Sequence, residues 1–474
     1  MTIQKESAKD IQLFSGLSEW DRASLNRSGV RDLTEAARME PGVVPEGFDL
    51  KACFARKGEL GWQTVAIVGL ESMKGKQSMV AGGGMKLKVI DNPLADDTLD
   101  HLVRSNIEAA TAMAQKFVVS GPIDSRTETP ICGTKFLAAI PDTDSETIEK
   151  TIEDMVIHFN PLLKKQLGTG GDENAPFPLV RKIMREKGFI HPQQGIIAGL
   201  GRPVEPTCTL MDDVCQVKVE VPLLGQMALV DMASAFTTFV SLKTATERAG
   251  LTLSDLHVGV QGTGAIGLPL LAFLHEAGVK IDAIASKNGL IIDSKNSISI
   301  PTVLAAFKKV PPRELDIALL QELKKGGQLP ESTRIIPFKK ILTVEESMIA
   351  LAAKITEPLH AILPCAGAHA ITANNVDLVE SILIGRRLIV GGANDGVTPE
   401  AEKHLTDSDV VTPPDFVVNS GVAALFGMVE DGTIREAIPE KILQLLTDNT
   451  EKWTKKLLDK AIKNGVTPRK ALQI

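Results

Sequence analysis

Three glycines near the middle of the chain, Gly262, Gly264 and Gly267, stand in G-x-G-x-x-G spacing. An apolar run at residues 256–260 precedes them, and a helical pattern at residues 268–277 follows. In a strand–turn–helix unit, such glycines allow a tight turn, close approach of the backbone to a pyrophosphate, and close packing of the helix on the strand. The first amides of the helix then face the phosphates. The pattern predicts a dinucleotide-binding turn made of Gly262, Thr263, Gly264, Ala265, Ile266 and Gly267.

A second apolar run, residues 279–285, completes a β-α-β unit and ends in Ser286, Lys287 and Asn288. An Asp or Glu at this strand end would accept hydrogen bonds from the ribose 2′-hydroxyl of NAD. The nearest acid, Asp282, lies inside the predicted strand. Ser286 can donate to a phosphate oxygen and Lys287 can neutralise its charge. We therefore expect NADP as the preferred cofactor and NAD as the alternative; a plain polar turn is the other interpretation.

Composition and charge exclude several classes of protein. The 474 residues carry 52 basic and 59 acidic side chains, a net charge of −7 without a basic block, which argues against nucleic-acid binding. Five scattered cysteines show no metal-ligand spacing and suit a reducing compartment. The first ten residues are polar, and no apolar run is long enough to span a membrane. We expect a cytoplasmic protein without a metal site or membrane contact.

Strand-like and helical patterns alternate along the chain, which indicates an α/β fold with two halves. Helical spacing begins at residues 9–17 and recurs at residues 226–249. Strands are expected at residues 214–221 and 409–411, among others. The chain closes with an amphipathic, lysine-rich helical segment.

Four ordered segments of the second half resemble the glutamate/leucine/phenylalanine/valine dehydrogenase family. They are the glycine turn at residues 261–267, the strand end at 363–368, the pair of segments 391–394 and 398–401, and residues 414–421. The motifs look closer to the branched-chain and aromatic amino-acid members than to the glutamate members. The resemblance implies cofactor contacts for Ser234, Cys365, Ala366 and Asn394, and a substrate contact for Asn419.

In the first half the resemblance is thinner. Gly83 and Gly84 resemble the turn beside the substrate, and Lys116 resembles the lysine that binds the substrate carboxylate. Lys135, in Cys132-Gly133-Thr134-Lys135, resembles the catalytic lysine. The interval between the two lysines is long for the family, so residues 119–131 would be an insertion.

Two residues compete for the place of the family's catalytic aspartate. Asp172 follows Lys135 at about the family's interval and precedes a helix. A rival register aligns residues 167–170 with the segment after that aspartate and puts Gln166, which cannot shuttle protons, in its place. We favour Asp172.

The resemblance implies domains at residues 1–227 for substrate binding and oligomerisation and at 228–425 for Rossmann-type cofactor binding. Residues 426–474 would form a helical segment that packs back on the first domain. The family's lysine for a glutamate side chain would fall at Gly82 and its serine near Phe426, so an apolar side-chain pocket is favoured.

The implied activity is reversible oxidative deamination of an L-amino acid to its 2-oxo acid and ammonia by a homo-oligomer. Hydride leaves Cα for the nicotinamide, a lysine activates water against the iminium, and a carboxylate relays protons. Two alternatives stay open: a dehydrogenase of a related amine or hydroxy acid, and a cofactor-binding regulatory or catalytically impaired homologue. The sequence feature that discriminates among these hypotheses is whether Asp172 or Gln166 occupies the position of the catalytic aspartate.

Overall fold

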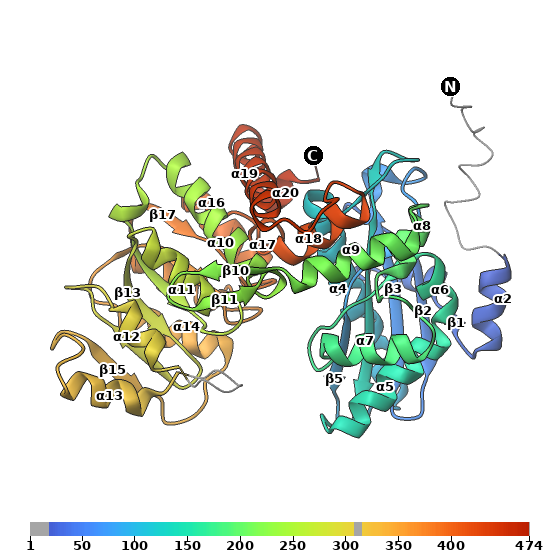
Figure 1. Cartoon of the computed structure of the whole chain (residues 1–474), viewed down its shortest axis with the longest axis horizontal. Helices are drawn as coiled ribbons and strands as arrows, with labels where there is room; N and C mark the ends of the chain where they lie inside the picture. The colour runs from blue at the N-terminus through green and yellow to red at the C-terminus, as the bar shows by residue number, and fades with distance from the viewer. Residues whose placement is uncertain (1–18, 308–314, 474) are drawn as a thin grey trace. The chain divides into compact units, whose positions relative to one another are not determined.

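The computed structural model describes residues 19–307 and 315–473, and Figure 1 labels many of its helices and strands. The helix expected at residues 9–17 lies outside the described residues. The chain divides into two compact units. The first unit contains the chain up to Asp213 with residues 426–436 and 473, and the second contains residues 214–425 and 437–472.

The first unit is built on a seven-stranded sheet in the order β1-β2-β3-β8-β4-β9, with β5 also paired to β8. Strand β3 lies between β2 and β8 and is antiparallel to both, whereas β4 and β5 run parallel to β8. The strands are β1 (Arg31–Asp32), β2 (Phe48–Lys57), β3 (Trp62–Leu70), β4 (Ala81–Gly82), β5 (Met85–Val89), β8 (Cys132–Ile140) and β9 (Leu167–Gly168).

Both faces of this sheet are covered, which is why every residue of β3 and β8 is buried. Alternate side chains of β3 point to opposite faces. Ala66 and Val68 share a core with Ile107 and Ala110 of α4 (Asp96–Ser120). Val65 and Ile67 share the opposite core with residues of α5 (Ser145–His158) and α6 (Asn160–Lys165). The first unit also contains α2 (Glu19–Arg27), α3 (Thr34–Met39), α7 (Phe177–Glu186), α8 (Gln194–Gly199) and most of α9 (Val204–Gln216).

Gly133 sets how closely α4 approaches β8. A Cβ atom added there would lie 2.2 Å from the carbonyl oxygen of Ala110 and 2.2 Å from the amide nitrogen of Ala114. Both atoms belong to the α4 backbone, which cannot yield as a side chain can. Because α4 carries Lys116 and β8 carries Lys135, this glycine brings the two elements with the candidate lysines into backbone contact.

The second unit is a doubly wound α/β domain, which confirms the predicted Rossmann-type architecture. Its six strands follow the order β15-β14-β13-β12-β16-β17. Strands β13, β12, β16 and β17 are parallel, while β14 and β15 are antiparallel additions at one edge. The strands are β12 (His257–Gln261), β13 (Lys280–Ala285), β14 (Gly289–Ile292), β15 (Arg334–Pro337), β16 (Leu359–Pro364) and β17 (Leu383–Ile389).

Helices cover both faces of this second sheet. One core gathers apolar side chains of α10 (Leu229–Arg248), α11 (Gly267–Glu276), α12 (Ile300–Ala305), α13 (Ile317–Lys325) and α19 (Pro439–Asn464). The opposite core gathers those of α14 (Val344–Ala352), α15 (Val376–Ser381) and α16 (Pro399–Asp407). The chain passes from β12 to β13 on one side and later returns to β16 on the other side of β12. The carboxyl ends of β12 and β16 therefore form the topological switch point where such sheets bind ligands.

The segment before the second sheet differs from the sequence-based expectation. Helix α9 continues to Gln216, so the strand expected at residues 214–221 begins only at β10 (Lys218–Val221). The helix expected at 226–249 begins at Leu229, because β11 (Gly225–Ala228) pairs with β10 in a hairpin. The strand expected at 409–411 is reduced to a single bridge between Val411 and Leu388.

The C-terminal segment also differs from expectation. Residues 426–436 cluster with the first unit, but residues 437–472 cluster with the second, and the units divide at residue 213 rather than 227. The reason is the packing of α19 on α10, where the Ser241 and Thr454 hydroxyls lie 3.0 Å apart and Arg248 pairs with Asp459. The remaining helices here are α17 (Asp415–Val418), α18 (Gly421–Glu430) and α20 (Pro468–Ala471).

We expect Gly133→Ala to lower the free energy of unfolding by about 1–3 kcal/mol, the usual cost of overpacking, because the new methyl group meets only backbone atoms. The measurement is the melting temperature. Gly170→Ala is the matched control, since an added Cβ there would come no closer than 3.7 Å to a neighbouring atom. Equal melting temperatures for the two variants would contradict the packing argument.

Candidate functional site

The glycine turn after β12 is shaped by two close backbone contacts. Gly262 has φ +101°, and an added Cβ would lie 2.5 Å from the Ala366 amide nitrogen. An added Cβ on Gly267 would lie 1.9 Å from the Gly262 carbonyl oxygen. Gly264 differs, because its Cβ would meet no atom within 4 Å. Two glycines thus close the turn. The third, Gly264, leaves open space in which a ligand phosphate could approach the protein backbone.

This open space is part of a cavity of about 480 Å³ at the switch point. Its wall is formed by residues of the glycine turn, the β13 end, the β16 end and two other loops. The lining residues are Gly262, Thr263, Gly264, Ala265, Ile266, Ser286, Lys287, Asn288, Leu315, Cys365, Ala366, Gly367 and Ala393. Lys287 is the one charged side chain among these described residues. The structure therefore brings together most of the cofactor-binding residues predicted from the sequence.

Ser286 and Lys287 both line the cavity, and the Ser286 hydroxyl takes part in the turn that follows β13. Its hydroxyl donates to Asn288 Oδ1 over 2.5 Å, and its amide donates to the Gly289 carbonyl. The turn between β13 and β14 therefore uses the hydroxyl hydrogen that was expected to reach a phosphate. Asp282 is also excluded from the cavity wall, because its buried carboxylate accepts from His257 Nδ1 and Ser297 Oγ at 2.6 and 2.9 Å.

Cys365 lies on the cavity wall as a packing residue. Burial raises the pKa of its thiol to about 12, so the sulfur is protonated and unreactive at neutral pH. Its amide donates to the Gln261 carbonyl over 2.6 Å, which joins the ends of β16 and β12. Space is tight on its other side, since a Cβ on Gly392 would lie 2.8 Å from the Cys365 sulfur.

Ser234, Asn394 and Asn419 come together in the second unit, although they are far apart in sequence. Asn419 Nδ2 donates to Asn394 Oδ1 over 3.0 Å, and Ser234 Oγ donates to the Asn419 carbonyl over 3.2 Å. Asn419 is only 5% exposed, and its Oδ1 atom is buried without a hydrogen-bond partner among the described residues. A buried acceptor of this kind is costly unless a ligand donor satisfies it.

In the first unit, Lys135 and Asp172 form a close ion pair. Lys135 lies in β8 and is 8% exposed, and its ammonium group contacts Asp172 Oδ2. Asp172 is held in its loop by reciprocal backbone hydrogen bonds with Ala175, of 3.1 and 3.0 Å. Burial by itself raises the pKa of Asp172. The charge and the hydrogen bond of Lys135 act in the opposite direction, and the net pKa lies below the ordinary value.

Gly83 and Gly84 bring the segment between β4 and β5 against this ion pair. A Cβ on Gly83 would lie 1.8 Å from the Thr134 carbonyl oxygen, and one on Gly84 would lie 3.0 Å from Asp172 Cβ. Side chains larger than hydrogen at either position would push the turn away from Lys135 or Asp172. Close packing therefore explains why glycine occupies both positions, which the sequence predicted to lie near the substrate.

Lys116 lies on α4, one residue before Phe117, whose ring covers Gly82. The long interval to Lys135 contains a hairpin of β6 (Ile123–Asp124) and β7 (Thr129–Pro130). Asp124, fully buried, anchors this hairpin by a 2.7 Å ion pair with Arg126. Residues 119–131, which we expect to be an insertion, contain this hairpin, and α4 and β8 remain in contact beside it.

Of the two candidates for the acidic position, Asp172 is the residue whose side chain contacts Lys135. Gln166 ends α6, and its carbonyl accepts the Ala81 amide over 3.0 Å. Sequence reasoning missed Lys86, which pairs with Glu173 at 2.5 Å and also lowers the pKa of Asp172. Lys86 could have been predicted as a site residue from its place in the segment Gly83-Gly84-Met85-Lys86. No sequence pattern near Leu315 indicates that it lines the cavity.

The lowered pKa of Asp172 predicts a pH-dependent contribution to stability. Its ionised form stabilises the folded state at pH values above the ordinary carboxyl pKa of about 4, and this contribution is lost as pH falls through the lowered folded value. The melting temperature of the wild type should therefore exceed that of Asp172→Asn by more at about pH 7 than at about pH 3. A difference that stays constant over this range would contradict the ion-pair argument.

Two absences hold for the parts of the chain that the structure describes. None of the helices there is both long enough and apolar enough to cross a membrane. No group of three or more His, Cys, Asp or Glu side chains in those same residues could hold a metal ion.

Comparison with known proteins finds similar sequences among curated proteins and similar folds among solved structures. The catabolic NAD-specific glutamate dehydrogenase of Bacillus subtilis is 23% identical over 235 residues, 48% of this chain and 47% of that protein. The NADP(+)-dependent glutamate dehydrogenase of Pyrobaculum calidifontis is 24% identical over 192 residues, 40% of this chain and 39% of that one. A hetero-hexameric glutamate dehydrogenase structure from Thermus thermophilus has a TM-score of 0.56 and 16% identity, covering 96% of this chain and 93% of that one.

These matches differ in what they establish. The sequence alignments span about half the length of the curated relatives, and the structural likeness supports the fold. The model of the Glutamate/Leucine/Phenylalanine/Valine dehydrogenase family matches residues 227–474, just over half of the chain. The matched range contains the glycine turn, the cavity wall and the Asn394–Asn419 pair. The chain belongs to the Glutamate/Leucine/Phenylalanine/Valine dehydrogenase family.

Proposed function

We propose that this chain is an NAD(P)-dependent amino-acid dehydrogenase that reversibly converts an L-amino acid to its 2-oxo acid and ammonia. The observation that carries the proposal is the Lys135–Asp172 ion pair. It lies outside the residues that the family model matches, yet it supplies the acid–base pair that the reaction requires. A cofactor-binding protein without catalysis would not need a buried lysine paired with a carboxylate in this way.

The residues around the glycine turn fit a nicotinamide dinucleotide. The open space at Gly264 and the first amides of α11 would hold the pyrophosphate, and Cys365 and Ala366 would border the nicotinamide ribose. Asn419 Oδ1, which has no partner within the described parts of the chain, offers an acceptor for a ligand donor beside Asn394. When bound, the nicotinamide accepts the hydride that leaves the substrate Cα.

The chain's own residues would then manage charge and protons. Lys116 would pair with the substrate carboxylate, and Gly83 and Gly84 would let the substrate approach the backbone. Lys135, after passing a proton to Asp172, would draw a proton from the water that attacks the iminium carbon. Asp172, ionised at neutral pH, can accept that proton and later deliver it to the departing ammonia.

We propose an amino acid with an apolar side chain as the substrate. A Cβ added to Gly82 would lie 2.6 Å from Phe117 Cζ and 2.9 Å from Ile196 Cδ1, so apolar groups occupy the space beside it. Gly82 and Phe426 stand where the sequence analysis placed the glutamate-binding lysine and serine. Without those groups, a second substrate carboxylate would be poorly neutralised on burial. The relatives named above are glutamate dehydrogenases, and the kinship to branched-chain and aromatic members stays a prediction.

The preferred cofactor in this proposal is NADP. Lys287 lies on the cavity wall at the β13 end, and no Asp or Glu belongs to the described lining. A cation there favours a 2′-phosphate, whereas a carboxylate would repel it. We also propose an oligomer, since the Thermus thermophilus glutamate dehydrogenase is a hetero-hexamer. That the oligomer contains identical copies of this chain stays the prediction made from the family resemblance.

The direct test of the proposed activity offers a panel of L-amino acids with NADP and with NAD, followed by the absorbance of the reduced nicotinamide. We expect turnover with apolar amino acids. Binding of the dinucleotide without turnover on any amino acid, amine or hydroxy acid would favour the regulatory alternative. Turnover confined to glutamate would contradict the apolar pocket.

Lys135→Ala should lower kcat by about a hundredfold or more, the usual effect of removing an acid–base group, while dinucleotide affinity stays near that of the wild type. Asp172→Asn should behave likewise. Gln166→Ala is the control and should have a small effect. Steady-state rates and calorimetric titration with NADPH give the two measurements, and the opposite ranking of Asp172 and Gln166 would show that the register is wrong.

Lys287→Ala should lower the ratio of kcat/KM for NADP to that for NAD by about tenfold, because one ionic contact to a phosphate is worth about 1–2 kcal/mol. Ser286→Asp should lower it further by repelling the 2′-phosphate. Lys295→Ala, an exposed lysine in the loop after β14, is the control and should leave the ratio unchanged. A wild type that prefers NAD would overturn the cofactor assignment.

A further inference from the structure

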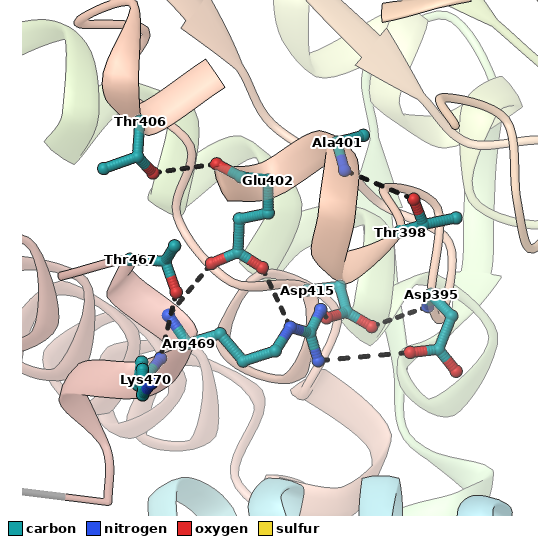
Figure 2. A network of polar contacts seen from close by, with 9 residues as sticks. All are labelled: Asp395, Thr398, Ala401, Glu402, Thr406, Asp415, Thr467, Arg469 and Lys470. Carbon is teal, nitrogen blue, oxygen red and sulfur yellow. Dashed lines mark hydrogen bonds and ion pairs between the residues drawn. The ribbon is translucent and has the colours of Figure 1, made fainter. Parts of the chain in front are cut away.

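Arg469, on the short C-terminal helix α20, reaches a cluster of buried acids in the second unit (Figure 2). Its amide and its Nε atom donate to the two oxygens of Glu402, at 3.0 and 2.9 Å. A terminal nitrogen of its guanidinium group donates to Asp415 Oδ1 at 2.5 Å. The guanidinium carbon also lies 5.6 Å from the centre of the Phe416 ring.

The charges of this cluster depend on Arg469. Glu402 is 2% exposed and Asp415 is 8% exposed, and a third carboxylate, that of Asp395, lies 4.0 Å from the guanidinium group. Burial by itself lowers the pKa of Arg469. The three carboxylates raise it by more than burial lowers it, so the net pKa lies above its ordinary value. Removal of the guanidinium group would take away the cation that pairs with both buried carboxylates.

Asp415 connects this cluster to the asparagine pair. Its second oxygen accepts the Asp395 amide at 2.7 Å, as Figure 2 shows, and its carbonyl accepts the Asn419 amide at 2.9 Å. Asp395 directly follows Asn394, and the Asn394 and Asn419 side chains are hydrogen-bonded to each other. One carboxylate residue thus holds the backbone beside both asparagines.

The segment that carries Asn394 needs such support. Asp395 has φ +50°, a left-handed conformation that a residue other than glycine adopts at a cost in free energy. Its carbonyl accepts the His369 amide at 2.8 Å, and its own amide bonds the Asp415 carboxylate. The Asp415 carboxylate is oriented in turn by Arg469 on the opposite side (Figure 2).

We propose that Arg469 is a positioning residue for cofactor binding. It fixes Asp415, which sets the places of Asn394 and Asn419 and orients the Asn419 Oδ1 atom, which has no hydrogen-bond partner among the described residues. Helix α20 thereby supports the cofactor site from outside, because Arg469 is not among the residues that line the cavity. This inference rests on the proposed function for its consequence in binding, but the contacts that it explains are independent of any ligand.

The test uses the full chain with Arg469→Met, Arg469→Lys and Lys470→Ala. Lys470 is the matched control, because it is an exposed cation on the same helix. Hydrogen exchange of the peptide covering residues 391–397 is measured without ligand, and the Kd for NADPH is measured by calorimetry well below the melting temperature. The melting temperature of each variant reports separately on general stability.

Arg469→Met should speed amide exchange at Asp395 and weaken NADPH binding by about tenfold, near the upper range for coupling through a side-chain network. Arg469→Lys, which keeps the charge but loses the forked geometry, should fall between that variant and the wild type. Lys470→Ala should match the wild type in both measurements. If Arg469→Met does not fold, Arg469→Lys and Asp415→Asn give the same two comparisons.

A lowered melting temperature with wild-type exchange and wild-type NADPH affinity would overturn the proposal and leave Arg469 as a structural clamp. A wild type that binds neither NADPH nor NADH would instead refute the proposed function. In that case the exchange measurement still decides whether Arg469 orders the Asn394 segment.

Discussion

Backbone-to-backbone contact at glycines is the constraint on which both candidate sites depend. In the second unit, Gly267 touches the Gly262 carbonyl and Gly262 touches the backbone of Ala366, which joins the ends of β12 and β16. In the first unit, Gly83 meets the Thr134 carbonyl and Gly133 meets the α4 backbone. A β-carbon at any of these positions would separate the elements that carry the polar groups. The geometry of both candidate sites therefore depends on the absence of side chains at these positions.

Each unit also contains buried or partly buried charges that are paired with opposite charges. Taking a charge from water into the protein is costly unless an opposite charge lies close by. Lys135 has Asp172 in the first unit, and Arg469 has Glu402 and Asp415 in the second. The first pair supplies groups that can exchange a proton, since a lysine and a carboxylate can trade one. The second involves an arginine, which keeps its proton, and so suits orientation rather than proton transfer.

The local part of this arrangement could be predicted from the sequence. The glycine turn, the β-α-β unit and the pairing of Asp172 with Lys135 follow from residue spacing and family motifs, and the structure has the corresponding geometry. Contacts made through distant segments could not be predicted. Helix α19 packs on α10, and Arg469 reaches Asp415 across 54 positions. Each depends on tertiary packing that no local pattern records, because short amphipathic helices can bury their apolar stripe against any matching surface.

The central claim is that the chain removes hydride from the Cα atom of an amino acid. The most direct measurement incubates the full chain with NADP and an apolar L-amino acid deuterated at Cα, and then locates the deuterium by mass spectrometry. The account predicts that the label appears on the reduced nicotinamide, with one ammonia released for each reduced cofactor. Label that remains on the amino acid, or reduced cofactor formed without ammonia, would contradict it.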